Sequence, residues 1–488
     1  MIILGTNSIK DTGYNVDNSL RLDDGSSAYM TKDDANPVSN NKTATYSFWC
    51  KRASLGSHQV VFMHGLDGSH ESQFKFRDSD VFEWHGYDGD TASPHWVALY
   101  RTTQVFRDNS AWLHFVIALD STSGTAGNRV KIYVNGNQIT SFAGGSENIV
   151  PSQNANFMID GGNSYKNRIG AVSYNAENFF DGYLAEFVFI DGQQLTPDSF
   201  GEFDEDSPTI WKPKDVSDLT FGTKGFYLDF EDSSNLGNDA NGGTDFTATN
   251  LTAVDQSTDT CTNNFATLNP LASSIDTSNN VLKEGNLQVD HGDNNYDGGT
   301  ATFGFLNNMT GKWYWEIRNN ANTGSSNQGE FAGISYIGDS SSTVYDDFGT
   351  ESYLLATTGS NIIYKKDNSA VWTLTSPSGF SAGDIINVAL DLDNSKIWFG
   401  LNGTFYDMSD GSTDGDPTGS NGATVSRDYD YLPYFRIYGN TAQLDFNFGS
   451  PAFSISSGNA DANGHGNFEY SVPSGYFALC TKNLAEFG

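Results

Sequence analysis

Short segments in which apolar and polar residues alternate constrain the fold of this sequence more than any other feature. In residues 129–134 (RVKIYV), Val130, Ile132 and Val134 share one face of an extended chain, and the residues between them share the other. Asn135-Gly136 follows, a pair that readily supplies the positive φ angles of a tight hairpin turn. The same arrangement returns in residues 396–401 before Asn402-Gly403. The pattern therefore predicts half-buried strands joined by hairpins, in two separate parts of the chain.

Further candidate strands are mostly short and bounded by Gly, Asn, Asp or Ser. They cover residues 19–22, 46–50, 60–63, 73–76, 112–119, 157–159, 182–190, 313–317, 331–335, 362–364, 385–392 and 443–448. Helical signals are scarce. The best is residues 195–201, where Thr196 can cap a turn, Pro197 can occupy its first position and Gly201 can end it. We therefore expect an all-β protein of antiparallel sandwiches with very little helix.

The length of 488 residues exceeds what one hydrophobic core supports, so two sandwich domains in tandem are expected. The first is predicted over residues 1–214 and the second over 265–450. Between them, residues 215–264 are rich in Asn, Asp, Thr and Gly and predict a partly ordered connector with one short strand at 225–230. Residues 407–429 predict a long exposed insertion. The tail, residues 451–488, is expected to dock through an apolar strand at 476–480.

Composition narrows the classes of partner. Lys plus Arg number 26 against 60 Asp plus Glu, a formal net charge of -34, which argues against nucleic acid and anionic membranes as ligands. Cys50, Cys261 and Cys480 each stand in an apolar setting and are expected to be buried free thiols. The first residues show no signal peptide, and no apolar run approaches the length that spans a bilayer.

Residues 19 to about 213 resemble the laminin G-like, concanavalin A-like jelly rolls. The resemblance depends on the order of five weak motifs, at residues 19–23 (SLRLD), 46–49 (YSFW), 112–116 (WLHFV), 130–136 (VKIYVNG) and 180–187 (FDGYLAEF). From about residue 265 to 449 the chain is similar to a SPRY domain. That stronger match depends on residues 311–316 (GKWYWE), 332–335 (AGIS), 388–393 (VALDLD), 397–403 (IWFGLNG) and 444–449 (LDFNFG).

The pairing of two such sandwiches, with the closing phrases at 195–201 and 475–484, resembles structural proteins of tailed bacteriophages, particularly marine ones. The resemblance implies a virion-surface component, either a tail or head fibre or a decoration protein. Such a protein would be made in the host cytoplasm, would contact other virion proteins and would recognise a host-surface glycan or protein. A homo-oligomer is expected because weak contacts gain from avidity, and a trimer suits a fibre. Two alternatives remain: a polysaccharide depolymerase that uses the first jelly roll, and a purely architectural decoration protein.

Three groups of residues suggest chemistry but have simpler explanations. Residues 202–206 (EFDED) resemble the catalytic strand of jelly-roll glycoside hydrolases, which hold two carboxyls about 5 to 5.5 Å apart. They precede Ser207-Pro208 and lack that family's flanking residues, so we interpret them as a solvated loop. Asp391 and Asp393 are expected to end a strand before a turn. Six histidines fall in the first domain without metal-ligand spacing. We predict no catalytic residues.

Calcium is the one ion that the sequence suggests, and no cofactor is required. Laminin G-like and pentraxin-like jelly rolls often hold it at one rim, and suitable donors here are Asp67, Asp120, Asp160 and Asp181. Asp160 and Asp181, each followed by Gly, are the candidate ligands, although Asp-Gly is also an ordinary turn dipeptide.

Aromatic residues beside polar ones suggest glycan binding, because sugars stack on rings and hydrogen-bond to polar neighbours. In the first domain the candidates are Trp84, His85, Tyr87 and Trp96, with core packing as the alternative for the two tryptophans. In the second domain they are Tyr429, Tyr431 and Tyr434.

Overall fold

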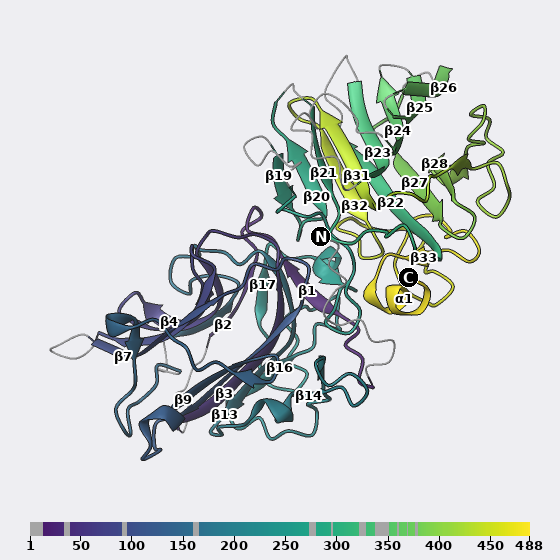
Figure 1. The fold of residues 1–488 in the computed structure, drawn as a ribbon. Helices are drawn as coiled ribbons and strands as arrows, with labels where there is room; N and C mark the ends of the chain where they lie inside the picture. The colour runs from purple at the N-terminus through teal and green to yellow at the C-terminus, as the bar shows by residue number, and fades with distance from the viewer. Residues whose placement is uncertain are drawn as a thin grey trace. The chain divides into compact units, whose positions relative to one another are not determined.

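The structure is a computed structural model that describes residues 13–33, 40–89, 95–159, 165–272, 280–293, 296–321, 328–336, 351–358, 361–367, 369–375 and 379–488. The described residues form two compact units, the first ending at Thr262 and the second beginning at Asn263. Strands dominate both units (Figure 1), and the described residues contain one α-helix, α1 (Thr481–Phe487). The all-β fold class expected from the alternating pattern is confirmed.

The first unit contains two large sheets, here called the A sheet and the B sheet. In spatial order, the A sheet contains β10 (Asn137–Gln138), β9 (Val130–Val134), β8 (Leu113–Asp120), β3 (Thr43–Arg52), β13 (Gly182–Asp191), β1 (Ser19–Leu22) and β18 (Gln256–Ser257), with β16 (Phe226–Leu228) also paired to β13. The B sheet contains β11 (Asn148–Ile149), β7 (His95–Val105), β6 (Val81–Asp88), β5 (His70–Phe76), β4 (Gln59–Asp67), β12 (Lys166–Ile169), β2 (Tyr29–Asp33) and β17 (Thr247–Thr249). A small hairpin joins β14 (Gly201–Phe203) to β15 (Trp211–Pro213).

The A and B sheets pack face to face through aromatic side chains. The Phe62 ring of β4 lies 5.6 Å from the Phe187 ring of β13, and Phe82 of β6 lies 4.6 Å from Phe115 of β8. Because side chains alternate along a strand, filling this core leaves every second residue of β5, β6 and β7 on the outer face of the B sheet. The core packing therefore fixes which residues of the B sheet can meet a ligand.

Local predictions from turn residues are confirmed. Asn135 and Gly136 have φ of 47° and 76° in the turn from β9 to β10, and Asn402 and Gly403 have φ of 52° and 79° in the second unit. The turn expected at residues 195–201 is the 3₁₀ helix η3 (Pro197–Ser199), whose N-cap is Thr196. Other 3₁₀ turns are η1 (Ala126–Asn128), η2 (Gly145–Glu147) and η4 (Ala253–Asp255). The three cysteines are free and buried, as expected.

The prediction of a connector over residues 215–264 is wrong. Strands β16, β17 and β18 from this segment pair with β13, β2 and β1, so the segment belongs to the first unit up to Thr262. The Tyr227 hydroxyl on β16 donates to both carboxylate oxygens of Glu186 at 2.9 and 3.0 Å. Burial raises the pKa of Glu186 to about 8, so the carboxyl holds a proton near neutral pH inside the fold. Strands of two or three residues are too short to show the alternation of apolar and polar residues. The segment was therefore predicted from its composition alone, which is typical of a connector.

The second unit also contains two large sheets. In spatial order, its C sheet contains β19 (Asn280–Lys283), β20 (Gln288–His291), β32 (Gln443–Asn447), β22 (Lys312–Ala321), β27 (Ile385–Asp391), β28 (Lys396–Leu401) and β29 (Thr404–Phe405), with β30 (Ala423–Thr424) on β28 and β33 (Phe477–Ala478) on β22. Its D sheet contains β21 (Tyr296–Thr300), β31 (Tyr431–Tyr438), β23 (Gln328–Tyr336), β24 (Ser352–Thr358), β25 (Asn361–Lys366) and β26 (Ser369–Thr375). Rings join the sheets, as between Phe435 and Phe446 at 5.1 Å.

The tail, residues 451–488, packs on the outer face of the C sheet. Phe468 packs its ring 5.0 Å from that of Tyr314 on β22, and β33 pairs in parallel with β22 at Trp313 and Tyr314. Beside Tyr314, the buried Glu316 carboxylate accepts hydrogen bonds from the backbone N–H groups of Glu469 at 2.9 Å and Tyr470 at 2.8 Å. The tail is thus part of the second unit, and its docking strand lies where the sequence predicts an apolar segment.

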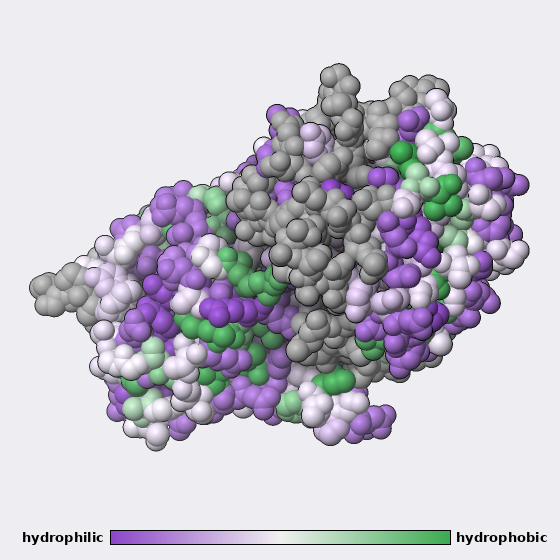
Figure 2. Space-filling model, turned by 45° about the horizontal axis from the view of Figure 1, so that its top comes forward, coloured by the Kyte–Doolittle hydropathy of each residue, from purple (hydrophilic) through white to green (hydrophobic). Residues whose placement is uncertain are grey.

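The described helices include none that is both long and apolar enough to cross a membrane. On the face drawn in Figure 2, hydrophilic and neutral residues cover most of the described surface, and hydrophobic residues occur in small separate groups. Large exposed apolar side chains among the described residues include Trp96, Tyr174 and Phe203. Exposed single aromatic side chains are therefore candidate contact points among the described residues.

Candidate functional site

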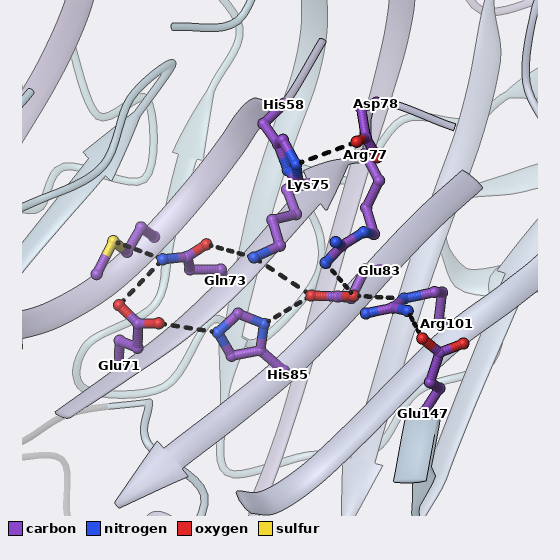
Figure 3. Close-up of polar contacts among 11 residues, drawn as sticks. His58, Glu71, Gln73, Lys75, Arg77, Asp78, Glu83, His85, Arg101 and Glu147 are labelled. Atoms are coloured by element: carbon purple, nitrogen blue, oxygen red, sulfur yellow. Dashed lines mark hydrogen bonds and ion pairs between the residues drawn. The ribbon is translucent and has the colours of Figure 1, made fainter. Parts of the chain in front are cut away.

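A cluster of charged side chains lies on the outer face of the B sheet, across β5, β6 and β7. The register pairs Gln73 with His85, Lys75 with Glu83, and Glu83 with Arg101, so these side chains project from the same side of three neighbouring strands (Figure 3). We call Glu71, Gln73, Lys75, Arg77, Glu83, His85 and Arg101 the polar network.

Glu83 is the centre of the polar network. Its side chain is 2% exposed and lies 3.2 Å from Lys75 Nζ, 3.1 Å from Arg77 Nη1 and 2.8 Å from Arg101 Nε. His85 Nδ1 lies 3.2 Å from the same carboxylate. Burial by itself would raise the pKa of Glu83, but the hydrogen bond from His85 and the charges of the neighbouring cations hold it well below its usual range. Glu83 is therefore an anchor that is ionised at neutral pH.

His85 bridges two carboxylates from neighbouring strands. While its Nδ1 faces Glu83, its Nε2 lies 3.1 Å from Glu71 Oε1, and the other oxygen of Glu71 accepts a hydrogen bond from Gln73 Nε2 at 3.0 Å. Arg101 also pairs with Glu147, which extends the network to the edge of the sheet (Figure 3). The charged groups thus hold one another in fixed positions.

An exposed aromatic pair borders the polar network. The Trp96 side chain is 39% exposed, and its ring centroid lies 5.0 Å from that of His85 and 4.8 Å from that of Tyr87. Tyr87 is half-buried and pairs in register with Trp96 across β6 and β7. The indole ring therefore packs edge to face against His85, which is 1% exposed and contacts two carboxylates. We call Tyr87 and Trp96 the aromatic pair.

Trp84, predicted as a ligand-binding residue, is instead part of the core. Its side chain is fully buried, and its Nε1 donates to Ser72 Oγ at 3.1 Å. The residue lies on the inner face of β6, one position before His85, so the alternation of the strand turns it away from solvent. Of the four candidates in the first unit, the structure brings His85, Tyr87 and Trp96 together on the outer face.

The candidates in the second unit are largely buried. Tyr431 and Tyr434 are 1% and 6% exposed on β31, so neither offers a ring face to a ligand, and the prediction for both is wrong. Tyr429 is half-buried, with its ring 4.8 Å from that of Tyr336. Tyr431 and Tyr434 are three residues apart and project from opposite faces of β31, and both faces are covered: Tyr431 packs in the main core, and Tyr434 packs with Leu354 and Ala356.

Of the two calcium candidates, Asp160 lies outside the described residues. Asp181 is buried, and a carboxylate oxygen from each of Asp23, Asp24 and Asp181 lies within 4.8 Å of the other two. Burial raises the pKa of Asp24, and the charge of Asp23 adds to the shift. Three crowded carboxylates fit the oxygen preference of calcium, while Arg52 nearby is a competing cation. Asp67 and Asp120 accept hydrogen bonds from backbone groups two residues on, within their own turns.

The two acidic segments considered as catalytic candidates in the sequence analysis make local structural contacts. Glu202 lies exposed on β14, and Asp204 accepts hydrogen bonds from the N–H groups of Asp206 and Ser207 in the turn that follows. In the second unit, the Asp391 carboxylate lies 2.8 Å from Lys312 Nζ and accepts a hydrogen bond from Asn394 N, while Asp393 accepts one from Gly311 N. Asp391 and Asp393 therefore stabilise the end of β27 and the turn that follows, as expected.

Sequence reasoning missed Glu71, Lys75 and Arg101 as members of one site. A signal was present, because HESQFKF and VFEWHGYD each alternate polar or charged residues, such as Glu71, Lys75 and Glu83, with aromatic ones. That pattern predicts a strand with a charged outer face. The pattern does not predict the register between the strands. That register places Glu83 next to three cations.

Comparisons with known proteins found matches of low identity and low TM-score. No curated protein matches the chain. Among solved structures, the SPRY domain of human HERC1 is 19% identical, with 34% of this chain and 91% of that one covered and a TM-score of 0.24. The carbohydrate-binding module CBM40 of the Ruminococcus gnavus IT-sialidase, bound to α2,3-sialyllactose, is 12% identical over 34% of this chain and 94% of that one, with a TM-score of 0.25.

Domains LG4-5 of the mouse laminin α1 chain are 10% identical, with 97% of this chain and 88% of that one covered and a TM-score of 0.27. A match at the level of a protein family covers only part of the first unit. Residues 24–199, which contain β2 to β13 and the polar network, match the concanavalin A-like lectin/glucanases superfamily.

Proposed function

We propose that the first unit binds carbohydrate on the outer face of the B sheet, with the aromatic pair as the contact for a sugar ring. The observation that carries the proposal is the exposed Trp96 ring held against a buried, doubly anchored His85. Sugar recognition combines an aromatic face with fixed polar groups, and rigid anchors reduce the entropy lost on binding. The match of residues 24–199 to a lectin/glucanase superfamily is compatible with this function.

We further propose that the site binds without cleaving. Glu71 and Glu83 do converge from neighbouring strands, which is the observation that favours a depolymerase as second candidate. A glycosidase requires an acid that can donate a proton to the leaving group. Glu83 is ill suited because its pKa lies well below the usual range, and both oxygens of Glu71 are engaged by His85 and Gln73. Release of new reducing ends from host polysaccharide by the pure protein would establish the depolymerase instead.

On the resemblance of the whole chain to tailed-phage structural proteins, we propose that it acts at the virion surface. The glycan would then belong to the host, the other partners would be virion proteins, and several copies would bind together, a trimer being the expected form. A purely architectural decoration protein is the alternative and predicts no binding to host cells. Antibody labelling of particles, combined with a host-cell binding assay, distinguishes these possibilities.

Replacing Trp96 by alanine is expected to weaken glycan binding roughly 10- to 30-fold, because a central exposed aromatic residue carries a large share of binding energy. A glycan array identifies the ligand, and calorimetric titration measures the affinity of the wild type and of Trp96→Ala. Phe203→Ala is the matched control, since Phe203 is 40% exposed on a different hairpin. Equal affinities for the wild type and Trp96→Ala would reject the aromatic pair as the contact.

We propose that Asp23, Asp24 and Asp181 together bind a calcium ion. Calcium at 100 times its dissociation constant should then stabilise the protein by about 2.7 kcal/mol, which thermal unfolding with calcium or with chelator measures. Asp181→Asn should abolish the shift, and Asp120→Asn, in a turn elsewhere, should leave it unchanged. A calcium response that persists in Asp181→Asn would exclude this cluster.

A further inference from the structure

A polar cavity opens on the B sheet, away from the polar network. It has a volume of about 450 Å³ and is formed by β2, β12 and β17 with the loop before β17. Its lining residues are Tyr29, Thr31, Lys32, Asp33, Lys166, Arg168, Thr244, Asp245, Thr247 and Thr249. The volume lies in the range of cavities that take small ligands. One wall, from Thr244 to Thr249, comes from the segment after residue 199 and is therefore absent from the superfamily match.

Strand register shows which side chains share the cavity's face. Arg168 pairs with Thr31 and Lys166 with Asp33 across β12 and β2, and Thr31 pairs with Thr247 across β2 and β17. Residues paired directly across antiparallel strands project to the same face. Lys32 belongs to the opposite face, and its ammonium group lies 5.2 Å from the centre of the Phe226 ring. The cations available to a ligand are therefore Lys166 and Arg168.

Arg168 is a buried cation whose contacts leave part of its guanidinium group unused. The residue is 7% exposed, its Nε donates to Thr31 Oγ1 at 3.1 Å and its Nη1 donates to the Val172 carbonyl at 2.6 Å. Its guanidinium lies 4.3 Å from the centre of the Tyr29 ring. Among the described residues, no carboxylate lies within ion-pair distance of Arg168 and no hydrogen bond occupies its Nη2. Burial lowers the pKa of Arg168, and the nearby Tyr29 and Asp33 oppose this shift only in part.

The remaining groups of the cavity suit hydroxyls. Four threonines supply hydroxyl groups that can donate and accept, and Asp33 and Asp245 supply acceptors. Lys166 Nζ lies 3.8 Å from Asp33 Oδ1 and is 45% exposed, so it remains available at the cavity mouth. The two carboxylates would repel a ligand with many negative charges, and the chain's net charge of -34 acts in the same direction. The arrangement suits a ligand with one anionic group and several hydroxyls.

We propose that this cavity binds an anionic sugar, with the anionic group on Arg168 and Lys166 and the sugar hydroxyls on the threonines and aspartates. Arginine is the side chain best matched to a carboxylate or sulfate, because its planar fork can donate two parallel hydrogen bonds. The assignment goes beyond the proposed function, since the cavity is formed by other strands than the aromatic pair and partly by residues outside the superfamily match.

To test the proposal, the whole chain is titrated with glucuronate, N-acetylneuraminate, glucose 6-sulfate and glucose. Ligand-observed NMR and calorimetry measure the binding of each sugar. At least one acidic sugar should bind at least tenfold more tightly than glucose. Comparing the two carboxylate sugars with the sulfate ester shows which anionic group the cavity prefers. Arg168→Gln should weaken that binding about tenfold or more, as expected for loss of a charge-assisted hydrogen bond. Lys166→Gln should weaken it about two- to fivefold. Lys131→Gln, on the A sheet, is the charge-matched control and should bind as the wild type does.

The Lys166→Gln variant and one further variant, Trp96→Ala, keep the outcome decisive. Lys166 is too exposed for its replacement to unfold the protein, so the Lys166→Gln result stands even if Arg168→Gln fails to fold. Trp96→Ala should leave binding of the acidic monosaccharide unchanged. Binding lost in Trp96→Ala but intact in both cavity variants would overturn the cavity assignment while leaving the proposed function in place. Equal binding of glucose and the acidic sugars, or no saturable binding of any acidic sugar, would also overturn it.

Discussion

Glu83→Ala is expected to lower the free energy of unfolding by about 3 to 5 kcal/mol, the range seen when one member of a buried ion network is removed. The variant would leave Lys75, Arg77 and Arg101 around an empty position from which the balancing charge is gone. Denaturant unfolding of the wild type and the variant measures the difference. The aromatic pair should also lose part of its support, because His85 would keep only one of its two carboxylate contacts, the one with Glu71.

Glu147→Ala is the matched control for Glu83→Ala. Glu147 pairs with the same Arg101 but is 46% exposed, so its removal should cost less than about 1 kcal/mol. The wild type should also lose stability in acid. The folded-state pKa of Glu83 is lowered, so its contribution is present above the pKa of the unfolded chain and disappears as the pH falls toward the folded-state value. A cost for Glu83→Ala no greater than that for Glu147→Ala would contradict the anchoring role.

Glu316→Ala should destabilise the second unit by a similar amount, about 3 to 5 kcal/mol, because four donors lose one buried acceptor group. These are the backbone N–H groups of Glu469 and Tyr470, the Tyr314 hydroxyl at 2.9 Å and Asn447 Nδ2 at 3.2 Å. Burial raises the pKa of Glu316 while these hydrogen bonds oppose the shift. The carboxylate therefore attaches the tail to β22.

Calorimetric unfolding measures the stability change, and limited proteolysis reports on the tail. Residues after Phe468 should become susceptible to proteases in Glu316→Ala at concentrations that leave the wild type intact. Glu469→Ala is the control, because that partly exposed side chain bonds only with Ser456 among the described residues and should cost about 1 kcal/mol or less. A protected tail in Glu316→Ala would show that the apolar contacts of Phe468 suffice.

The sequence was most informative where short-range chemistry decides the structure. Asn135-Gly136 and Thr196-Pro197 determine local backbone angles, so their turns could be predicted from two residues. Alternation in VKIYV and KIWFGL likewise identified strands, although Tyr133 and Trp398, on the faces expected to be exposed, are also buried. The composition of residues 215–262 failed as a guide because tertiary pairing, not local propensity, makes β16, β17 and β18 into strands.

The candidate site shows the same division. His85, Tyr87 and Trp96 could be predicted because aromatic and polar residues adjoin in the sequence, whereas Trp84 shows that adjacency says nothing about which face a residue occupies. Arg101 and Glu71 lie on other strands from Glu83, and only the register brings them together. The anionic-sugar cavity could not be predicted at all, since its lining comes from three strands widely separated along the chain.

The central claim is that a glycan contacts the outer face of β5, β6 and β7. Hydrogen–deuterium exchange of the whole chain, with and without the glycan that binds best on the array, tests it directly. We predict slower exchange in peptides that cover residues 70–88 and 95–105, which contain the polar network and the aromatic pair. Protection confined to the second unit, with no change in these peptides, would contradict the claim.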